Sequence, residues 1–266
     1  MKKTMYSTML GLTLLAAHTV VKADEPNAQD IAANQRLSGI YSSIWNGTRN
    51  QLRLGQHKID ERWKKDAGIR VYSLDISIRI VGEPYYRLAL VLDTLKRIEP
   101  AQYCLDPEWL HITILLLDLG DSEETEPAQL DQMLMEKYGD ILSRALAETP
   151  KFEIQFKGIA ATSGAIIAQG FAGTAIYSMR DAIRKELSAE GIVLGKQTGL
   201  THSTLVRFIE PLNNPTELVR AINILNNADL GSFQVDRISF VAHDWIPQEN
   251  GYATLRKTPI RSFELV

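Results

Sequence analysis

Two histidines share one local pattern and are the residues of this sequence best suited to catalysis. His111 is followed two positions later by Thr113, and His202 is followed two positions later by Thr204. Side chains two positions apart in a strand project from the same face, so each pattern places an imidazole beside a hydroxyl. Both patterns begin apolar segments that are typical of strands. The sequence therefore predicts two equivalent halves of one site.

Two imidazoles and two hydroxyls suit phosphodiester chemistry that uses no metal. One neutral histidine can remove a proton from the attacking water or ribose hydroxyl, while the other, protonated, gives a proton to the departing oxygen. The threonine hydroxyls can donate to the non-bridging phosphate oxygens, where negative charge develops. We therefore expect His111 and His202 to be the catalytic residues and Thr113 and Thr204 to bind the substrate phosphate. Which histidine is the acid and which the base stays open.

The elements around the two patterns recur in the same order. The sequence predicts strands and helices at residues 71–80 (strand), from Pro84 (helix), 111–117 (strand), from Pro127 (helix), 152–158 (strand), 165–171 (strand), 175–190 (helix), 201–209 (strand), from Pro215 (helix) and 233–241 (strand). The two histidines are 91 residues apart, the helices that start at Pro127 and Pro215 are 88 apart, and the strands that follow these helices are 81 apart. This agreement predicts a duplicated strand-helix-strand-helix-strand unit.

The N-terminal segment has the features of a secretory signal. Lys2 and Lys3 precede an apolar run that ends at Val21-Lys22-Ala23, with small residues at the positions a signal peptidase requires. The run is short for a membrane span and contains polar residues, so an uncleaved anchor is the lesser alternative. We expect a signal peptide at 1–23, an N-terminal helical extension at 24–68 and two pseudo-symmetric lobes at 69–266. The protein would then be exported, to the periplasm of a bacterium or beyond it.

Charge and cysteine content limit the partners. The formal net charge is −3, and loss of the three lysines in residues 1–23 makes the chain more acidic, which disfavours binding to long duplex nucleic acid. Cys104 is the only cysteine, so an internal disulfide and a cysteine-rich zinc site are both excluded. We expect a monomer with no stable membrane insertion, no cofactor and a small nucleotide or short oligonucleotide as substrate.

The two motifs resemble those of the 2H phosphoesterases, a family named for two His-x-Thr/Ser motifs. Residues Pro107-Glu108-Trp109-Leu110-His111-Ile112-Thr113 are similar to the family's Pro-x-x-Leu-His-x-Thr form, and Thr201-His202-Ser203-Thr204-Leu205 is similar to the second motif. The resemblance covers about residues 71 to 258. It implies an α+β fold of two lobes, with antiparallel sheets flanking a central cleft and helices on the outside. It also implies cyclic phosphodiesterase or RNA 2′-5′ ligase-type activity without a bound metal.

Several interpretations of the function stay open at this point. The first is hydrolysis or opening of a phosphodiester, either a 2′,3′-cyclic phosphate or a 2′-5′ linkage. The second is a catalytically silent nucleotide- or phosphate-binding protein on the same fold. A metallohydrolase is the third, although no Asp or Glu lies at ligand spacing beside either motif. Two histidines buried for purely structural reasons would be the plainest alternative.

Three further residues are weighed as site candidates. Strand alternation places Arg207 on the face opposite His202 and Thr204, unless a bulge shifts the register. His57 lies in a polar segment, and His243 follows Val241 at the end of an expected strand. We expect both of these histidines to be surface or structural residues.

Overall fold

The computed structural model describes residues 27–61, 70–122, 132–195, 199–247 and 253–266. The expected signal peptide at 1–23, both ends of the expected extension and the start of the helix expected from Pro127 lie outside the described residues.

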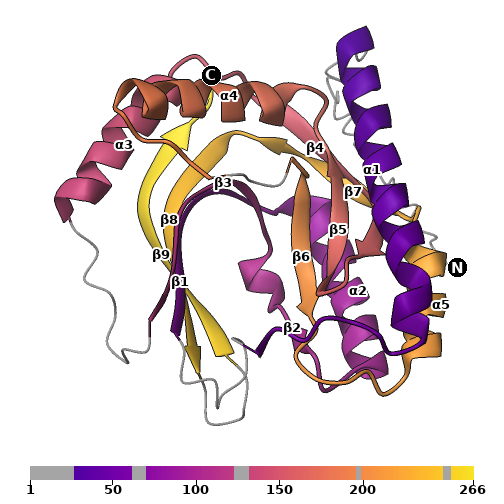
Figure 1. The fold of residues 1–266 in the computed structure, drawn as a ribbon. Coiled ribbons are helices and arrows are strands. Elements are labelled where there is room, and N and C mark those ends of the chain that lie inside the picture. The colour runs from indigo at the N-terminus through magenta and orange to yellow at the C-terminus, as the bar shows by residue number, and fades with distance from the viewer. Residues whose placement is uncertain (1–26, 62–69, 123–131, 196–198, 248–252) are drawn as a thin grey trace, which may run out of the picture.

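Two antiparallel sheets form the centre of the molecule (Figure 1). The first sheet has the order β3-β1-β8-β9, with bounds β3 His111–Ser122, β1 Arg70–Arg79, β8 Arg237–Pro247 and β9 Ala253–Glu264. The second sheet has the order β2-β6-β5-β4-β7, with bounds β2 Tyr103–Cys104, β6 His202–Arg207, β5 Ala165–Phe171, β4 Phe152–Ala161 and β7 Asp229–Val235. The first sheet is strongly curled. The predicted α+β fold with antiparallel sheets is confirmed.

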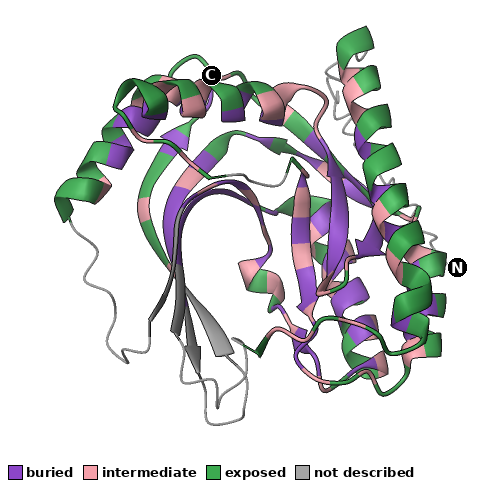
Figure 2. Ribbon diagram, viewed as in Figure 1, coloured by how far each residue is buried: buried purple, intermediate pink, exposed green. Residues whose placement is uncertain are grey.

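The helices cover the outer faces of the two sheets. Their bounds are α1 Ala28–Arg53, α2 Gly82–Ile98, α3 Gln132–Leu146, α4 Ala175–Ala189 and α5 Pro215–Leu225, with a short 3₁₀ helix at Pro107–Trp109. Helices α3 and α4 pack on the first sheet, whereas α1, α2 and α5 pack on the second. Exposed residues line the outward faces of these helices, whereas β5 and the described side chains of β8 are mostly buried (Figure 2). No helix among the described residues is long and apolar enough to cross a membrane.

The sheet orders show how the duplicated halves are joined. Strands β3, β1, β8 and β9 occupy the same successive places in the first sheet as β6, β5, β4 and β7 in the second. The first half therefore contributes β1 and β3 to the first sheet and β4 to the second. The second half contributes β5 and β6 to the second sheet and β8 to the first. The single strand expected at 233–241 is wrong, because the chain changes sheets near Asp236 and forms β7 and β8 instead. No glycine or proline marks that change in the sequence.

The described part of the N-terminal extension contains one long helix, α1, packed on the second sheet. Helix α1 begins where the side chain of Asn27 accepts a hydrogen bond from the backbone N–H of Asp30, a standard N-cap. Its buried residues, Leu37, Tyr41, Trp45 and Leu52, recur at helical spacing and face β4, β5 and α5. The Trp45 indole donates to the Asn223 side chain at 3.0 Å. The extension is therefore part of the core of this half.

Strand β4 contains a bulge that requires a glycine. Its pairing register with both neighbouring strands shifts close to Gly158, whose φ is +79°. A Cβ at this position would lie 1.7 Å from the backbone oxygen of Asn226. Because the obstacle is backbone, a side-chain rearrangement cannot relieve the clash.

We expect Gly158→Ala to lower the free energy of unfolding by about 4 kcal/mol or more, since backbone strain and steric overlap add. Gly55→Ala is the matched control, because Gly55 has a similar φ of +70° with nothing within 4 Å of the added carbon. Left-handed backbone alone should cost about 1 to 2 kcal/mol there. Urea denaturation of both variants measures the difference, and equal losses would contradict this account of the bulge.

Candidate active site

The two motif strands lie at sheet edges that meet. Strand β3 is the edge strand of the first sheet, and β6 is bordered only by the two-residue β2, which pairs with Val206 and Arg207. The half of β6 that carries His202 and Thr204 therefore also lies at an edge of its sheet in the described part of the chain. Strands β3 and β6 contact each other. Their contact supports the predicted convergence of the motifs, while an imidazole separation below about 10 Å, the limit for flanking one phosphate, stays a prediction.

The two motifs have the same local geometry. His111 and Thr113 are both partly exposed, with buried Ile112 between them, and His202 and Thr204 are partly exposed around a buried serine. Each imidazole and its threonine therefore share a face, as strand alternation predicts. In each strand the residue after the threonine is a β-bulge that the pairing register skips. This residue is Ile114 where β3 pairs with β1, and Leu205 where β6 pairs with β5. Bulges of this kind often re-aim side chains beside active sites.

The bulge at Leu205 corrects the expectation for Arg207. Without it Arg207 would lie on the face opposite His202, but the extra residue returns Arg207 to the partly exposed side of the strand. Its guanidinium lies 3.8 Å from the Asp60 carboxylate. Arg207 also lowers the pKa of His202, which places its charge within electrostatic reach of the site.

Each motif histidine is oriented by the backbone two residues before it. The Nδ1 of His111 lies 2.7 Å from the carbonyl oxygen of Trp109, and His202 makes a hydrogen bond with the backbone of Leu200. A carbonyl can only accept, so Nδ1 of His111 carries the proton and Nε2 keeps a lone pair. In this tautomer Nε2 of His111 is suited to accept a proton from a nucleophile.

Both motif histidines are held in the neutral form. Burial, followed by the nearby His243, lowers the pKa of His111 to about 4. Burial, followed by Arg180 and Arg207, lowers the pKa of His202 to about 4. A bound phosphate anion beside either ring would raise its pKa, because an opposite charge favours the protonated form. The site is therefore prepared for proton abstraction, and the acid role requires a bound anion.

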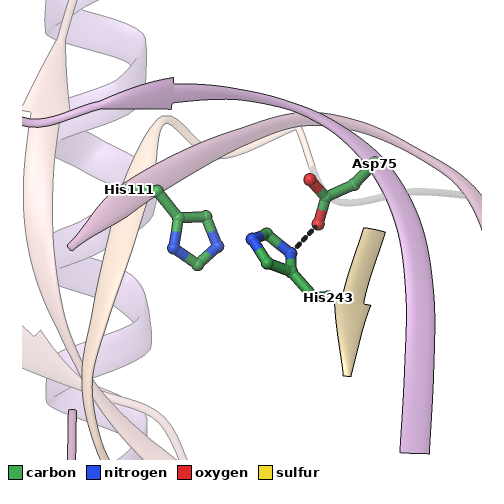
Figure 3. Close-up of side chains that lie close together, drawn as sticks. All are labelled: Asp75, His111 and His243. Carbon is green, nitrogen blue, oxygen red and sulfur yellow. Dashed lines mark hydrogen bonds and ion pairs between the residues drawn. The ribbon is translucent and has the colours of Figure 1, made fainter. Parts of the chain in front are cut away.

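His243 is buried beside His111, so of the two expected alternatives the surface position is wrong (Figure 3). The two ring centroids are 4.6 Å apart with an interplanar angle of 37°. Nδ1 of His243 lies 2.7 Å from Oδ2 of Asp75, and both side chains are almost completely buried. Asp75 comes from β1 and His243 from β8, so the curled first sheet brings together three residues that are far apart in sequence.

Asp75, His111 and His243 are also the described residues whose types and proximity could hold a metal ion. One ligand-type atom from each lies within 4.8 Å of the others. No Asp or Glu lies at ligand spacing beside either motif in the sequence, but the fold brings the Asp75 carboxylate close to His111 and His243. In the structure, however, Oδ2 of Asp75 and Nδ1 of His243 are joined by a hydrogen bond. The arrangement is that of an Asp-His pair beside a second imidazole ring.

Lys257 adds a cation to the same concave region. From β9, its Nζ lies 3.4 Å from Oγ of Ser77, whose residue pairs with Thr113 across β1 and β3. Burial lowers the pKa of Lys257, and the lysine in turn lowers the pKa of His111. Lys257 is therefore a phosphate-binding candidate that the motifs did not reveal, since β9 was not among the expected strands.

Arg180 links the two motif strands from the buried face of α4. It is 2 % exposed, and its Nε donates to the carbonyl of Ile114 at 2.8 Å. Its Nη2 donates to the carbonyl of Leu200 at 2.7 Å, and Nη1 to that of Gly199 at 3.1 Å. The guanidinium thus satisfies carbonyls next to both motifs. Its position among the buried Ile176, Met179, Ile183 and Leu187 in α4 is the sequence signal that could have identified it.

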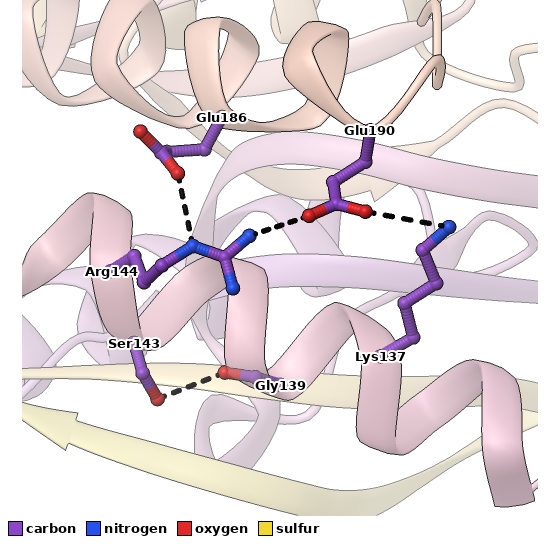
Figure 4. Close-up of polar contacts among 6 residues, drawn as sticks. All are labelled: Lys137, Gly139, Ser143, Arg144, Glu186 and Glu190. Carbon is purple, nitrogen blue, oxygen red and sulfur yellow. Dashed lines mark hydrogen bonds and ion pairs between the residues drawn. The ribbon is translucent and has the colours of Figure 1, made fainter.

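Helix α4 is in turn connected to α3 on the surface (Figure 4). Arg144 lies 3.1 Å from Glu186 and 2.9 Å from Glu190, and Lys137 lies 3.8 Å from Glu190. These side chains are partly exposed, so each ion pair contributes little by itself. Together they connect a helix of the first half to the helix that carries Arg180.

The N-terminal helix supports the second motif. The Tyr41 hydroxyl donates to the carbonyl of Thr201, the residue directly before His202. Burial raises the pKa of Tyr41, so the hydroxyl keeps its proton and acts as a donor. His57, by contrast, contacts the carbonyls of Gly55 and Glu210 through its two ring nitrogens, which confirms its expected structural role.

Comparison with known proteins agrees with this fold and these motifs. The chain belongs to the family of the AKAP7 2'5' RNA ligase-like domain, whose family model matches residues 89–252, a stretch that includes both motifs. This membership confirms the resemblance to the 2H phosphoesterases and assigns a 2H phosphoesterase or RNA ligase-like function in general terms.

Two solved structures show the same fold. The protein TT0787 of Thermus thermophilus is 17% identical, with a TM-score of 0.52 over 73% of this chain and 97% of that one. E. coli LigT complexed with 3'-AMP is 14% identical, with a TM-score of 0.50 over 73% of this chain and 98% of that one. No curated protein matches the chain in sequence.

We expect Arg180→Lys to lower the free energy of unfolding by about 2 to 3 kcal/mol, since an ammonium cannot reach all the carbonyls and leaves some unsatisfied. Arg184→Lys, one turn later and exposed with Asp181 as its partner, should change it by less than about 0.5 kcal/mol. Chemical denaturation of the two variants checks this. Equal stabilities would show that the contacts of Arg180 do not hold the motif strands.

Proposed function

We propose that the protein is a metal-independent phosphoesterase that hydrolyses or opens a phosphodiester in a small nucleotide or short oligonucleotide. The observation that carries this proposal is the equivalence of the two His-x-Thr motifs. Each has the same pattern of exposure, the same bulge after the threonine and the same contact of the imidazole with the backbone two residues before it. A 2′,3′-cyclic phosphate and a 2′-5′ linkage are the proposed scissile groups.

In the proposed reaction one imidazole removes a proton from the attacking water as its oxygen bonds to phosphorus. The bond from phosphorus to the departing oxygen breaks, and that oxygen takes a proton from the other imidazole. One proton enters and one leaves the pair of histidines, so the site returns to its starting charge after they exchange protons with water. Thr113 and Thr204 donate to the non-bridging oxygens, where Lys257 and Arg207 add positive charge.

The substrate class is supported by chemistry and by a related structure. LigT, which shares the fold, has been crystallised with 3'-AMP, a small nucleotide. The acidic net charge of this chain disfavours extended nucleic acid, whereas the local cations suit a single phosphate. We further propose that the protein acts as a monomer after export, on the basis of the lysine-led apolar run in residues 1–23.

A silent nucleotide- or phosphate-binding protein is the second candidate. The observation that favours it is the pKa of about 4 at both motif histidines, because neither imidazole is then protonated near neutral pH without a ligand. Turnover distinguishes the two candidates. A purified protein that binds 3'-AMP but cleaves none of a panel of cyclic and 2′-5′-linked nucleotides would support the silent protein.

We expect His111→Ala and His202→Ala each to lower kcat by about 10²- to 10⁴-fold, because each removes one proton transfer. The double variant should be little worse than the poorer single one, since both transfers serve one transition state. Thr113→Ala and Thr204→Ala should cost about 10- to 10³-fold, as each removes a hydrogen bond to the phosphate. Steady-state kinetics with thermal melts provides the measurement. A folded, fully active histidine variant would end the two-histidine mechanism.

We expect activity to survive dialysis against EDTA, because the imidazoles supply both proton transfers and Asp75 is engaged with His243. Initial rates before and after chelation, and after addition of Zn²⁺ or Mn²⁺, test this. Loss of activity that an added metal restores would instead assign ligand roles to the histidines.

A further inference from the structure

His111 differs from His202 in having a second imidazole against it. The His243 ring lies 4.6 Å from the His111 ring, and Asp75 holds His243 through a 2.7 Å hydrogen bond. Asp75 Oδ2 also accepts a hydrogen bond from the Ser73 hydroxyl at 3.5 Å. Asp75, Ser73 and His243 are all buried. The cations described near His202 are instead the permanently charged Arg180 and Arg207.

His243 contacts both other members of this cluster, Asp75 through a hydrogen bond and His111 through its ring. A buried carboxylate needs a positive partner, and His243 is the titratable group in direct contact with Asp75. If His243 carries a proton, a second proton on His111 would place two like charges on rings whose centroids are 4.6 Å apart. Burial, followed by the nearby His243, lowers the pKa of His111 and so keeps His111 neutral.

Resting on the proposed function, we infer that Asp75 and His243 are positioning residues that keep His111 as the general base of the reaction. His202 is then the general acid, because the negative charge of a bound phosphate offsets the cations around it. Asp75 fixes the His243 ring, and the His243 ring limits both the orientation and the protonation of His111. Neither residue contacts the reacting atoms.

The other charged groups around His111 do not duplicate this role. Lys257 on β9 lowers the pKa of His111, as His243 does, whereas Asp75 on β1 raises it. Arg79, the pairing partner of His111 on β1, acts on Lys257. Among these groups His243 is the one whose ring packs against the His111 ring, with centroids 4.6 Å apart, so it can limit the orientation of His111.

The test is His243→Gln, which removes the competing ring and leaves the Asp75 carboxylate to act on His111. We expect the NMR titration midpoint of His111 to rise by about one pH unit, since a like charge is removed and the opposite charge remains. The acid limb of the pH profile of kcat/KM should move up in parallel. We expect kcat to fall by about 10- to 10²-fold with KM nearly unchanged, as phosphate contacts are retained.

Two further variants make the result decisive. Asp75→Asn is isosteric and should lower kcat by about tenfold by releasing the His243 ring, with KM again nearly unchanged. His57→Gln is the control, because His57 is likewise a hydrogen-bonded imidazole, here with two backbone carbonyls, but lies away from this cluster, and it should leave the kinetics and the His111 midpoint unchanged. Thermal melts show that each variant is folded.

The possible outcomes separate this inference from the proposed function. If folded His243→Gln leaves the His111 midpoint and the acid limb in place, or folded Asp75→Asn keeps full kcat, the inference is overturned while the enzyme stands. If the wild-type protein cleaves no diester but the midpoint moves as expected, the proposed function fails and the coupling of the rings stands. Stoichiometric zinc bound by the wild type and lost in His243→Gln would also overturn the inference, because the cluster would then be a metal site.

Discussion

The arrangement of the motifs depends on the Arg180 guanidinium. Edge strands leave backbone carbonyls unpaired, and one buried side chain satisfies those of Ile114, Gly199 and Leu200 at the place where the two sheets meet. A single planar group with five donors can do this, whereas an apolar residue of the same size would leave buried oxygens without partners. The same charge lowers the pKa of His202, so the group that fixes the backbone also sets the electrostatics of the site.

Duplication accounts for the equivalence of the motifs, and exchange of strands accounts for their meeting. Each half passes a strand to the sheet of the other, as β4 and β8 show. Helix α2 likewise packs on the second sheet and α4 on the first. Two halves connected in this way cannot separate without breaking sheet hydrogen bonds, which makes the relative position of the motif strands a property of the whole fold.

The halves diverge where the chemistry requires an asymmetry. The curl of the first sheet turns β1, β8 and β9 inward and collects Asp75, His243 and Lys257 around His111. The second motif has arginines and the N-terminal helix in their place, with Tyr41 holding the carbonyl before His202. Two similar imidazoles thus acquire different surroundings, which is how one site can assign different proton-transfer tasks to the same residue type.

The sequence alone determined the two His-x-Thr motifs and their strand context, because these follow from local periodicity and from residues two positions apart, and the resemblance of the motifs to those of the 2H phosphoesterases implied the α+β fold. The sequence placed most helices and strands but merged β7 with β8, since no glycine or proline marks the change of sheet near Asp236. It assigned Arg207 to the wrong face, because a bulge cannot be read from alternation. Only the tertiary structure brought His243, Asp75, Lys257 and Arg180 to the motifs. Their contacts connect strands and helices that are distant in the chain, and such contacts are decided by sheet order and curvature, which no local pattern encodes.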